Sequence, residues 1–188
     1  MHSKVNILGH PVHPMLVAYP IAFNTATLVG FVIYGVNPDL FWLKLTIAVN
    51  AAAVVMAVVA AIPGFIDWAA AIPSGTPAKL TGRIHMGLNV AALVLFIISF
   101  FAYYRYWNGP ADVGATLGIV LTVIGVALTV AAGFQGWILI QNHHVGVQLT
   151  PDQQRPGARS ATTLTIAGSR RCGSGLSEHG VQASVIAP

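Results

Sequence analysis

Five of the seven histidines flank long apolar stretches of the chain. The first two, His10 and His13, lie in the motif GHPVHP at residues 9–14, just before the first stretch. The third stretch opens with His85, and the fourth is followed by His143 and His144. If all four stretches cross a membrane, these imidazoles meet at one membrane face. Neutral imidazole is a ligand for haem iron, copper and zinc, so this pattern predicts a haem or metal site.

Histidine pairs from different helices are the arrangement that such a site needs. We expect His13 with His85, or His10 with His143, to act as axial or coordinating pairs, with haem b or a transition metal ion as the cofactor. The metal ligands predicted first are His13 and His85. A helical turn would place His10 and His13 on one side, because they are three positions apart. The alternative is that each histidine is solvated or bonded to a frayed helix end.

Two further polar residues are candidate members of this site. Asn89 lies four positions after His85 and would share its helix face. Asp67 is expected on the same membrane side, where it could ligate a metal or orient a histidine ring through the other ring nitrogen. The predicted cofactor-binding set is therefore His10, His13, His85, His143, Asn89 and Asp67.

The composition indicates that lipid surrounds the protein. Apolar residues make up 55% of the chain and charged residues only 7%, whereas a soluble domain carries about 25% charged residues. Four segments reach the roughly 20 residues of a membrane helix, at about 14–34, 41–62, 85–104 and 113–140. We expect an all-α integral membrane four-helix bundle over residues 8–149. Residues 150–188, rich in Gly, Ser, Thr, Gln and Arg, predict a disordered cytoplasmic tail.

Turn residues and polar residues refine this outline. Pro63 and Gly64 are expected to break the second span, after which residues 65–68 would lie along the membrane interface. Pro20 should bend the first span, because proline frees the carbonyl of Leu16. The two helical hairpins are only loosely similar in sequence, so no internal repeat is predicted. Four polar side chains within the spans are expected to point into the bundle: Asn24, Asn50, Asn89 and Gln135.

Orientation follows from the distribution of Lys and Arg near the span ends. The N-terminal side holds Lys4, Lys79, Arg83, Arg155 and Arg159, and the opposite side holds Lys44 and Arg105. The positive-inside rule therefore predicts a multi-pass protein of the inner (cytoplasmic) membrane with both termini in the cytoplasm.

Several classes of function are disfavoured by the sequence. Basic patches with interleaved aromatic residues are absent, so nucleic acid is not an expected partner. No buried acid pair, nucleophile elbow or phosphate-binding loop is recognisable, which favours a protein that is not an enzyme by itself. The expected partners are the lipid bilayer, membrane redox proteins and a second copy of the chain, for which the glycines of the fourth span offer an interface.

The motifs also resemble a known family. The segment 9–17, the segment 63–68 (PGFIDW), His85 with Asn89, and Gly136 and His143 with the Val-Gly-Val of residues 145–147 are similar to domain of unknown function 2231, a bacterial family of predicted four-helix membrane proteins. The resemblance covers about residues 8–149. It implies recurring polar residues at His10, His13, Asp67, His85, Asn89 and His143. Some members are joined to Rieske iron–sulfur domains, which implies a place near membrane electron transfer.

The leading hypothesis is therefore a haem- or metal-binding subunit of a membrane electron-transfer system, whose histidine cluster lies at the cytoplasmic face. The alternative is a structural or assembly membrane protein that binds a partner or lipid headgroups without a metal. A small-solute permease would need a continuous polar path, for which the spans hold too few polar residues.

Overall fold

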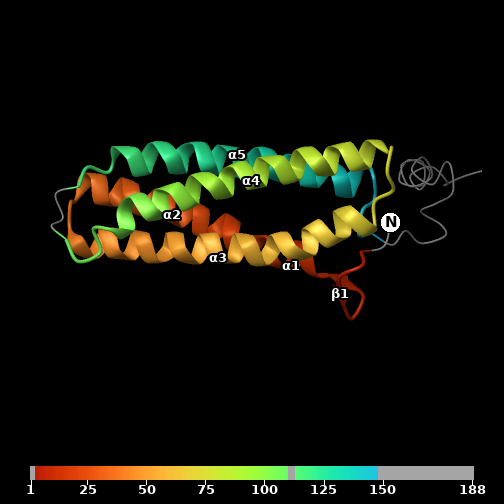
Figure 1. Ribbon diagram of the computed structural model, residues 1–188, viewed down its shortest axis with the longest axis horizontal. Helices are drawn as coiled ribbons and strands as arrows, with labels where there is room; N and C mark the ends of the chain where they lie inside the picture. Colours follow the sequence, from red (N-terminus) through yellow and green to blue (C-terminus); the bar gives the residue numbers. More distant parts are fainter. Residues whose placement is uncertain (1–2, 110–112, 148–188) are drawn as a thin grey trace, which may run out of the picture. The chain divides into compact units, whose positions relative to one another are not determined.

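The computed structural model describes residues 3–109 and 113–147, so the predicted tail at 150–188 lies outside the described residues. Two short strands precede the helices, β1 (Asn6–Ile7) and β2 (His10–Pro11). The helices are α1 (Val12–Leu16), α2 (Ala18–Val36), α3 (Leu40–Ala70), α4 (Pro77–Tyr104) and α5 (Thr116–Gln141). The all-α prediction is confirmed, because helices account for nearly all of the described secondary structure (Figure 1).

Within residues 3–109 and 113–147, four helical segments are long and apolar enough to cross a membrane. They are Val12–Val36, Leu40–Ala70, Pro77–Tyr104 and Thr116–Gln141, which confirms the number of spans. Their bounds differ from the prediction at the second and third spans. Helix α3 continues through Pro63 to Ala70, so the predicted break there was wrong, and residues 65–68 are the last turns of α3.

The helices form two antiparallel hairpins, α2 with α3 and α4 with α5. Helix α2 also packs on α5, and α3 packs on α4, so each helix has two neighbours around a common interior. Figure 1 shows the N-terminal segment, the α3–α4 connection and the end of α5 at one end of these helices. An even number of spans therefore brings the regions that carry His13, His85 and His143 to the same end, as the sequence predicted.

The motif GHPVHP is divided between a β-hairpin and a helix. Strands β1 and β2 pair antiparallel, with Ile7 opposite His10, and the turn between them is made by Leu8 (φ 50°) and Gly9 (φ 81°). Positive φ at both positions is the signature of a tight two-residue hairpin turn. The prediction that His10 and His13 share a helical turn was wrong, because His10 belongs to β2 and His13 to α1.

Pro20 explains why the first span is divided. It has no amide hydrogen, so it cannot bond to the carbonyl four residues earlier, at Leu16. The helix is interrupted at Val17, between α1 and α2, while the bonds Val17 N–His13 O (3.1 Å) and Ile21 N–Val17 O (3.3 Å) carry the chain across the interruption. The predicted bend is thus located one turn before Pro20.

The two hairpins are equivalent units, which the sequence comparison of the halves did not reveal. The counterpart of a residue lies 72 positions later, as His85 does from His13 and Ala132 from Ala60. Each buried residue of α5, namely Gly118, Thr122, Gly125 and Ala132, is the counterpart of a buried residue of α3, namely Thr46, Asn50, Ala53 and Ala60. Buried Pro20, Asn24, Thr27 and Phe31 of α2 correspond in the same way to buried Ala92, Phe96, Ser99 and Tyr103 of α4.

This equivalence describes a parallel repeat, in which two hairpins enter the bundle from the same end. The interface of α2 with α5 is the counterpart of the interface of α4 with α3, and both are present. Equivalent residues that touch each other must lie near the pseudo-twofold axis between the hairpins. Phe31 and Tyr103 are such a pair, with ring centroids 4.6 Å apart, and His13 and His85 are another.

Candidate functional site

The structure brings together two of the predicted histidines, His13 from α1 and His85 from α4. Their ring centroids are 6.1 Å apart and the ring planes are nearly perpendicular, at 89°. Both side chains are half-buried. Because His13 opens the first span and His85 lies two turns inside α4, the pair sits near the end of the bundle that also holds the chain's N-terminal segment.

Each ring is held by the backbone of the other helix in its own hairpin. The Nδ1 atom of His13 lies 2.8 Å from the carbonyl oxygen of Ala60 in α3. The Nδ1 atom of His85 lies 2.7 Å from the carbonyl oxygen of Ala132 in α5. In both cases the partner is 47 positions later in the chain. The two contacts are therefore one local structure, formed twice.

A glycine one helical turn after each carbonyl makes room for the imidazole. A Cβ atom at Gly64 would come within 2.7 Å of His13 Nδ1, and one at Gly136 within 3.2 Å of His85 Cε1. At Gly64 this close approach of a ring to a helix backbone requires glycine, whereas at Gly136 the neighbouring ring would have to shift by a few tenths of an ångström. Gly64 therefore seats the His13 ring and does not break the helix.

The hydrogen bonds fix the tautomer of both rings. A carbonyl oxygen only accepts, so each Nδ1 carries the hydrogen and each neutral ring keeps its lone pair on Nε2. At His85, the amide nitrogen of Asn89 lies 3.2 Å from Nε2 and also donates to the His85 carbonyl at 2.9 Å. The predicted pairing of Asn89 with His85 is thus present, although Asn89 is exposed and does not point into the bundle.

The other predicted site residues lie outside the contacting pair. Asp67, near the end of α3, accepts hydrogen bonds from Ser3 Oγ (2.6 Å), Lys4 N (2.7 Å) and Val5 N (3.2 Å). It therefore anchors the N-terminal segment that leads into the β-hairpin. His10 is exposed in β2, where its Nδ1 lies 3.1 Å from the carbonyl of Leu8. His143 follows the end of α5 and is half-buried.

Across residues 3–109 and 113–147, no three His, Cys, Asp or Glu side chains are grouped as a metal site would require. The predicted gathering of five histidines is thus reduced to one pair of contacting rings. The order of the spans along the chain predicts that the histidine-bearing ends lie at one level of the membrane. The orientation of each ring depends instead on the tertiary contacts at Ala60 and Ala132, which residue spacing does not reveal.

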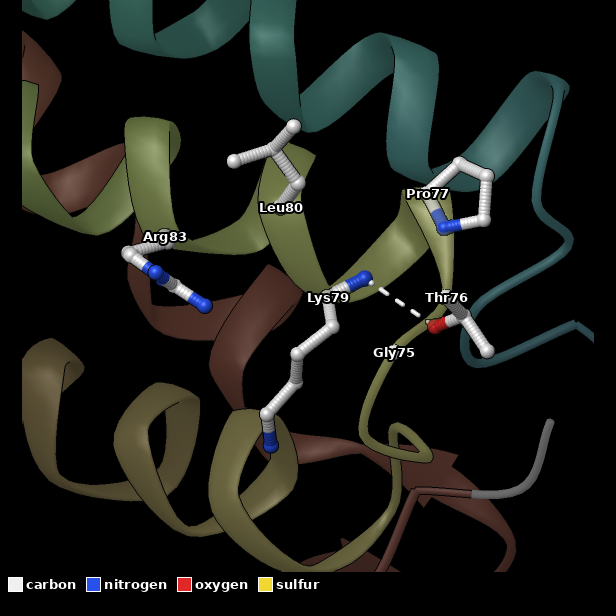
Figure 2. A pocket seen from close by; sticks show the side chains of 6 residues that line it. All are labelled: Gly75, Thr76, Pro77, Lys79, Leu80 and Arg83. Atoms are coloured by element: carbon white, nitrogen blue, oxygen red, sulfur yellow. Dashed lines mark hydrogen bonds between the residues drawn. The ribbon is translucent and has the colours of Figure 1, made fainter.

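A hollow of ≈ 390 Å³ lies beside the α3–α4 connection, lined by Gly75, Thr76, Pro77, Lys79, Leu80 and Arg83 (Figure 2). The ammonium of Lys79 donates to the carbonyls of Trp68, Ala69 and Ile72, and it stands 4.2 Å from the centroid of the Trp68 ring. Lys79 therefore caps the end of α3. Arg83 is exposed at the edge of the hollow. Neither residue belongs to the site that the sequence predicts, where Lys79 and Arg83 bear only on orientation.

Four long apolar helices in two equivalent hairpins, with a histidine pair near one end, define a four-helix integral membrane protein that would sit in a lipid bilayer. The chain belongs to the family described as predicted membrane protein (DUF2231), whose family model matches residues 9–149. This confirms the resemblance that the motifs suggested. Comparisons with curated proteins and with solved structures find no match.

Proposed function

We propose that His13 and His85 together bind one transition metal ion, either as a free ion or as haem iron, and that the protein serves a membrane electron-transfer system. The observation that carries this proposal is the pairing of two imidazoles from different hairpins at 6.1 Å. Both rings hold their lone pair on Nε2, because both Nδ1 atoms are occupied by backbone carbonyls.

The ring separation is compatible with a shared ion. Two imidazole nitrogens, each about 2.0–2.1 Å from one ion, place their ring centroids roughly 5–6.5 Å apart, depending on the angle between them at the ion, and the observed 6.1 Å lies in this range. A histidine ligand commonly donates its second ring N–H to a carbonyl or carboxylate, which fixes the ring and raises its basicity. The carbonyls of Ala60 and Ala132 would supply this support to both ligands. Solvent or a partner protein would complete the coordination shell of a free ion.

The experiment is a visible spectrum and a metal analysis of the full-length protein, purified in mild detergent after expression with ample haem, iron, copper and zinc. We expect bound haem or about one equivalent of metal, reduced at least tenfold in His13→Ala and in His85→Ala. His10→Ala is the matched control and should retain the cofactor. A haem band distinguishes haem iron from a free ion. A colourless, metal-free wild-type preparation would disprove the proposal.

A second candidate function is a structural or assembly role without a metal, and the Asn89 side chain favours it. Its amide donates to the same His85 nitrogen that a metal would need, so His85 is already satisfied within the protein. In this alternative the exposed Arg83 beside the hollow would hold the phosphate of a lipid headgroup. The amount of anionic lipid that stays bound to the purified protein should then fall in Arg83→Gln, and the metal content should not change.

The variant Asn89→Ala separates the two candidate functions. Removing the amide frees His85 Nε2, so a metal site should bind its ion equally well or more tightly. If the histidine has only a structural role, the variant should lose thermal stability and bind no metal. Placement in the inner membrane, cytoplasmic termini and redox partners are parts of the same proposal, supported by the Lys and Arg distribution and by the family resemblance.

A further inference from the structure

A layer of buried polar side chains crosses the interior of the bundle, one from each long helix. Thr27 of α2, Asn50 of α3, Ser99 of α4 and Thr122 of α5 are all at most 1% exposed. In the first hairpin, Thr27 lies nine residues before the end of α2 and Asn50 ten residues after the start of α3. At a rise of 1.5 Å per residue, Thr27 and Asn50 lie at the same height along the bundle to within about one helical turn.

The repeat extends this layer to the second hairpin. Ser99 is the counterpart of Thr27, and Thr122 is the counterpart of Asn50, because each lies 72 positions later. A pseudo-twofold axis along the bundle places counterparts at equal depth. The four side chains therefore lie at about one level in the bundle interior, nearer the end formed by the α2–α3 and α4–α5 connections than the end that holds the histidine pair.

The layer has more hydrogen-bonding groups than the described protein atoms satisfy. The hydroxyls of Thr27 and Thr122 donate to Phe23 O (2.8 Å) and Gly118 O (2.7 Å) in their own helices, so their oxygens remain acceptors. Both Asn50 amide atoms, Nδ2 and Oδ1, and the Ser99 hydroxyl have no partner among the described residues. Groups of this kind are costly in a membrane protein, where lipid offers no replacement partner.

We propose that this layer is a binding site for ordered water, bridging Asn50 and Ser99 in the bundle interior. The bound molecule must accept a hydrogen bond from the Asn50 amide nitrogen and donate one to the Asn50 amide oxygen, and water does both. A bare cation cannot accept a hydrogen bond, so it would leave Nδ2 unsatisfied. Buried water typically makes about three hydrogen bonds to such groups, and the hydroxyl oxygens of Thr27 and Thr122 offer further acceptors.

Magnetisation transfer from water to the labelled full-length protein in lipid bilayers tests this site by solid-state NMR. Asn24 is an internal control of the same residue type, because it is 6% exposed and its amide donates to Thr129 Oγ1 at 3.4 Å. We expect transfer to the Asn50 side-chain nitrogen to be several-fold faster than transfer to that of Asn24. Equal rates at the two amides would overturn the proposal.

The variant Ser99→Ala gives a second readout that changes little in volume. If water bridges the two residues, transfer to Asn50 should slow markedly in this variant, while Asn24 is unaffected. If Asn50 and Ser99 instead bond directly to each other, the wild-type protein shows slow transfer at Asn50 and the variant shifts its amide resonance without any water signal. That outcome also overturns the proposal, and neither readout depends on the histidine pair.

Discussion

His13 and His85 are equivalent residues of the two hairpins, and their rings meet 6.1 Å apart at an angle of 89°. Each donates from Nδ1 to an alanine carbonyl 47 positions later. Because counterparts in a twofold arrangement approach each other only near its axis, this contact marks the axis at one end of the bundle. A ligand bound between them would meet the same carbonyl support behind both rings, whereas only His85 has a side-chain amide, that of Asn89, at its Nε2.

The glycines beside the rings give the first prediction. Gly64→Ala should destabilise the protein by about 1–3 kcal/mol, the usual cost of an overpacked site, because its Cβ would lie 2.7 Å from His13 Nδ1. Gly136→Ala should cost less, because its nearest contact is 3.2 Å. The free energy of unfolding can be measured by denaturation in mixed micelles.

Gly133→Ala is the matched control for these two variants. It lies in α5 and a Cβ there meets nothing within 4 Å, so the better helix propensity of alanine should stabilise it by up to about 1 kcal/mol. If Gly64→Ala is as stable as Gly133→Ala, the close seating of His13 on α3 is wrong.

Asp67 gives the second prediction, which concerns the N-terminal segment. Its carboxylate accepts three hydrogen bonds from Ser3, Lys4 and Val5. Asp67→Asn replaces one acceptor oxygen by a donor and removes the charge, so at least one bond is lost. We expect faster hydrogen exchange at the amides of Lys4 and Val5 and faster proteolysis before the β-hairpin.

The control for Asp67→Asn is Asp39→Asn, at the other end of α3. Asp39 is an N-cap whose side chain accepts from Phe41 N at 2.7 Å, and asparagine caps helices about as well as aspartate. This variant should leave exchange at Lys4 and Val5 unchanged. Unaltered exchange in Asp67→Asn would show that the anchor contributes little.

The sequence predicts the number of spans but not the end of α3. The four spans and their even number followed from apolar length, which depends only on composition along the chain. The course of α3 through Pro63 could not be predicted in this way. A proline stops a helix only where packing does not compensate the lost hydrogen bond, and Pro63 is buried in the bundle. Propensity alone therefore misplaced the end of that helix.

The candidate site was predicted less completely, for a similar reason. Spacing predicts that His13 and His85 lie at one membrane level, but Asp67, predicted either to ligate a metal or to orient a histidine ring, accepts hydrogen bonds from the N-terminal segment. The repeat was hidden because counterparts preserve burial more than identity, as with Asn24 and Phe96. The 72-residue spacing of His13 with His85 and of Gly64 with Gly136 was the signal available in the sequence.

Lys79 gives the third prediction. Its ammonium donates to three carbonyls at the end of α3 and lies over the Trp68 ring. Lys79→Met keeps an unbranched side chain but removes the cation from a helix C-terminus, where a positive charge typically contributes 0.3–1 kcal/mol. We expect a loss of about that size and faster hydrogen exchange in residues 69–72. Arg83 is exposed on the next turn of α4, so Arg83→Met should leave that exchange unchanged. Equal effects of the two variants would contradict the capping role of Lys79.

The fourth prediction concerns the topology on which the histidine pair depends. Four exposed asparagines serve as matched probe positions, Asn6 and Asn142 at one end of the bundle and Asn37 and Asn108 at the other. Each is changed to cysteine in a Cys172→Ser background and labelled with a membrane-impermeant maleimide in intact spheroplasts. With cytoplasmic termini, Asn37→Cys and Asn108→Cys react at once, and Asn6→Cys and Asn142→Cys react only after permeabilisation. The reverse pattern would invert the orientation but would still allow His13 and His85 to meet. Labelling of Asn6→Cys and Asn142→Cys from opposite sides would require an odd number of spans, which would separate the histidine-bearing ends of the two hairpins.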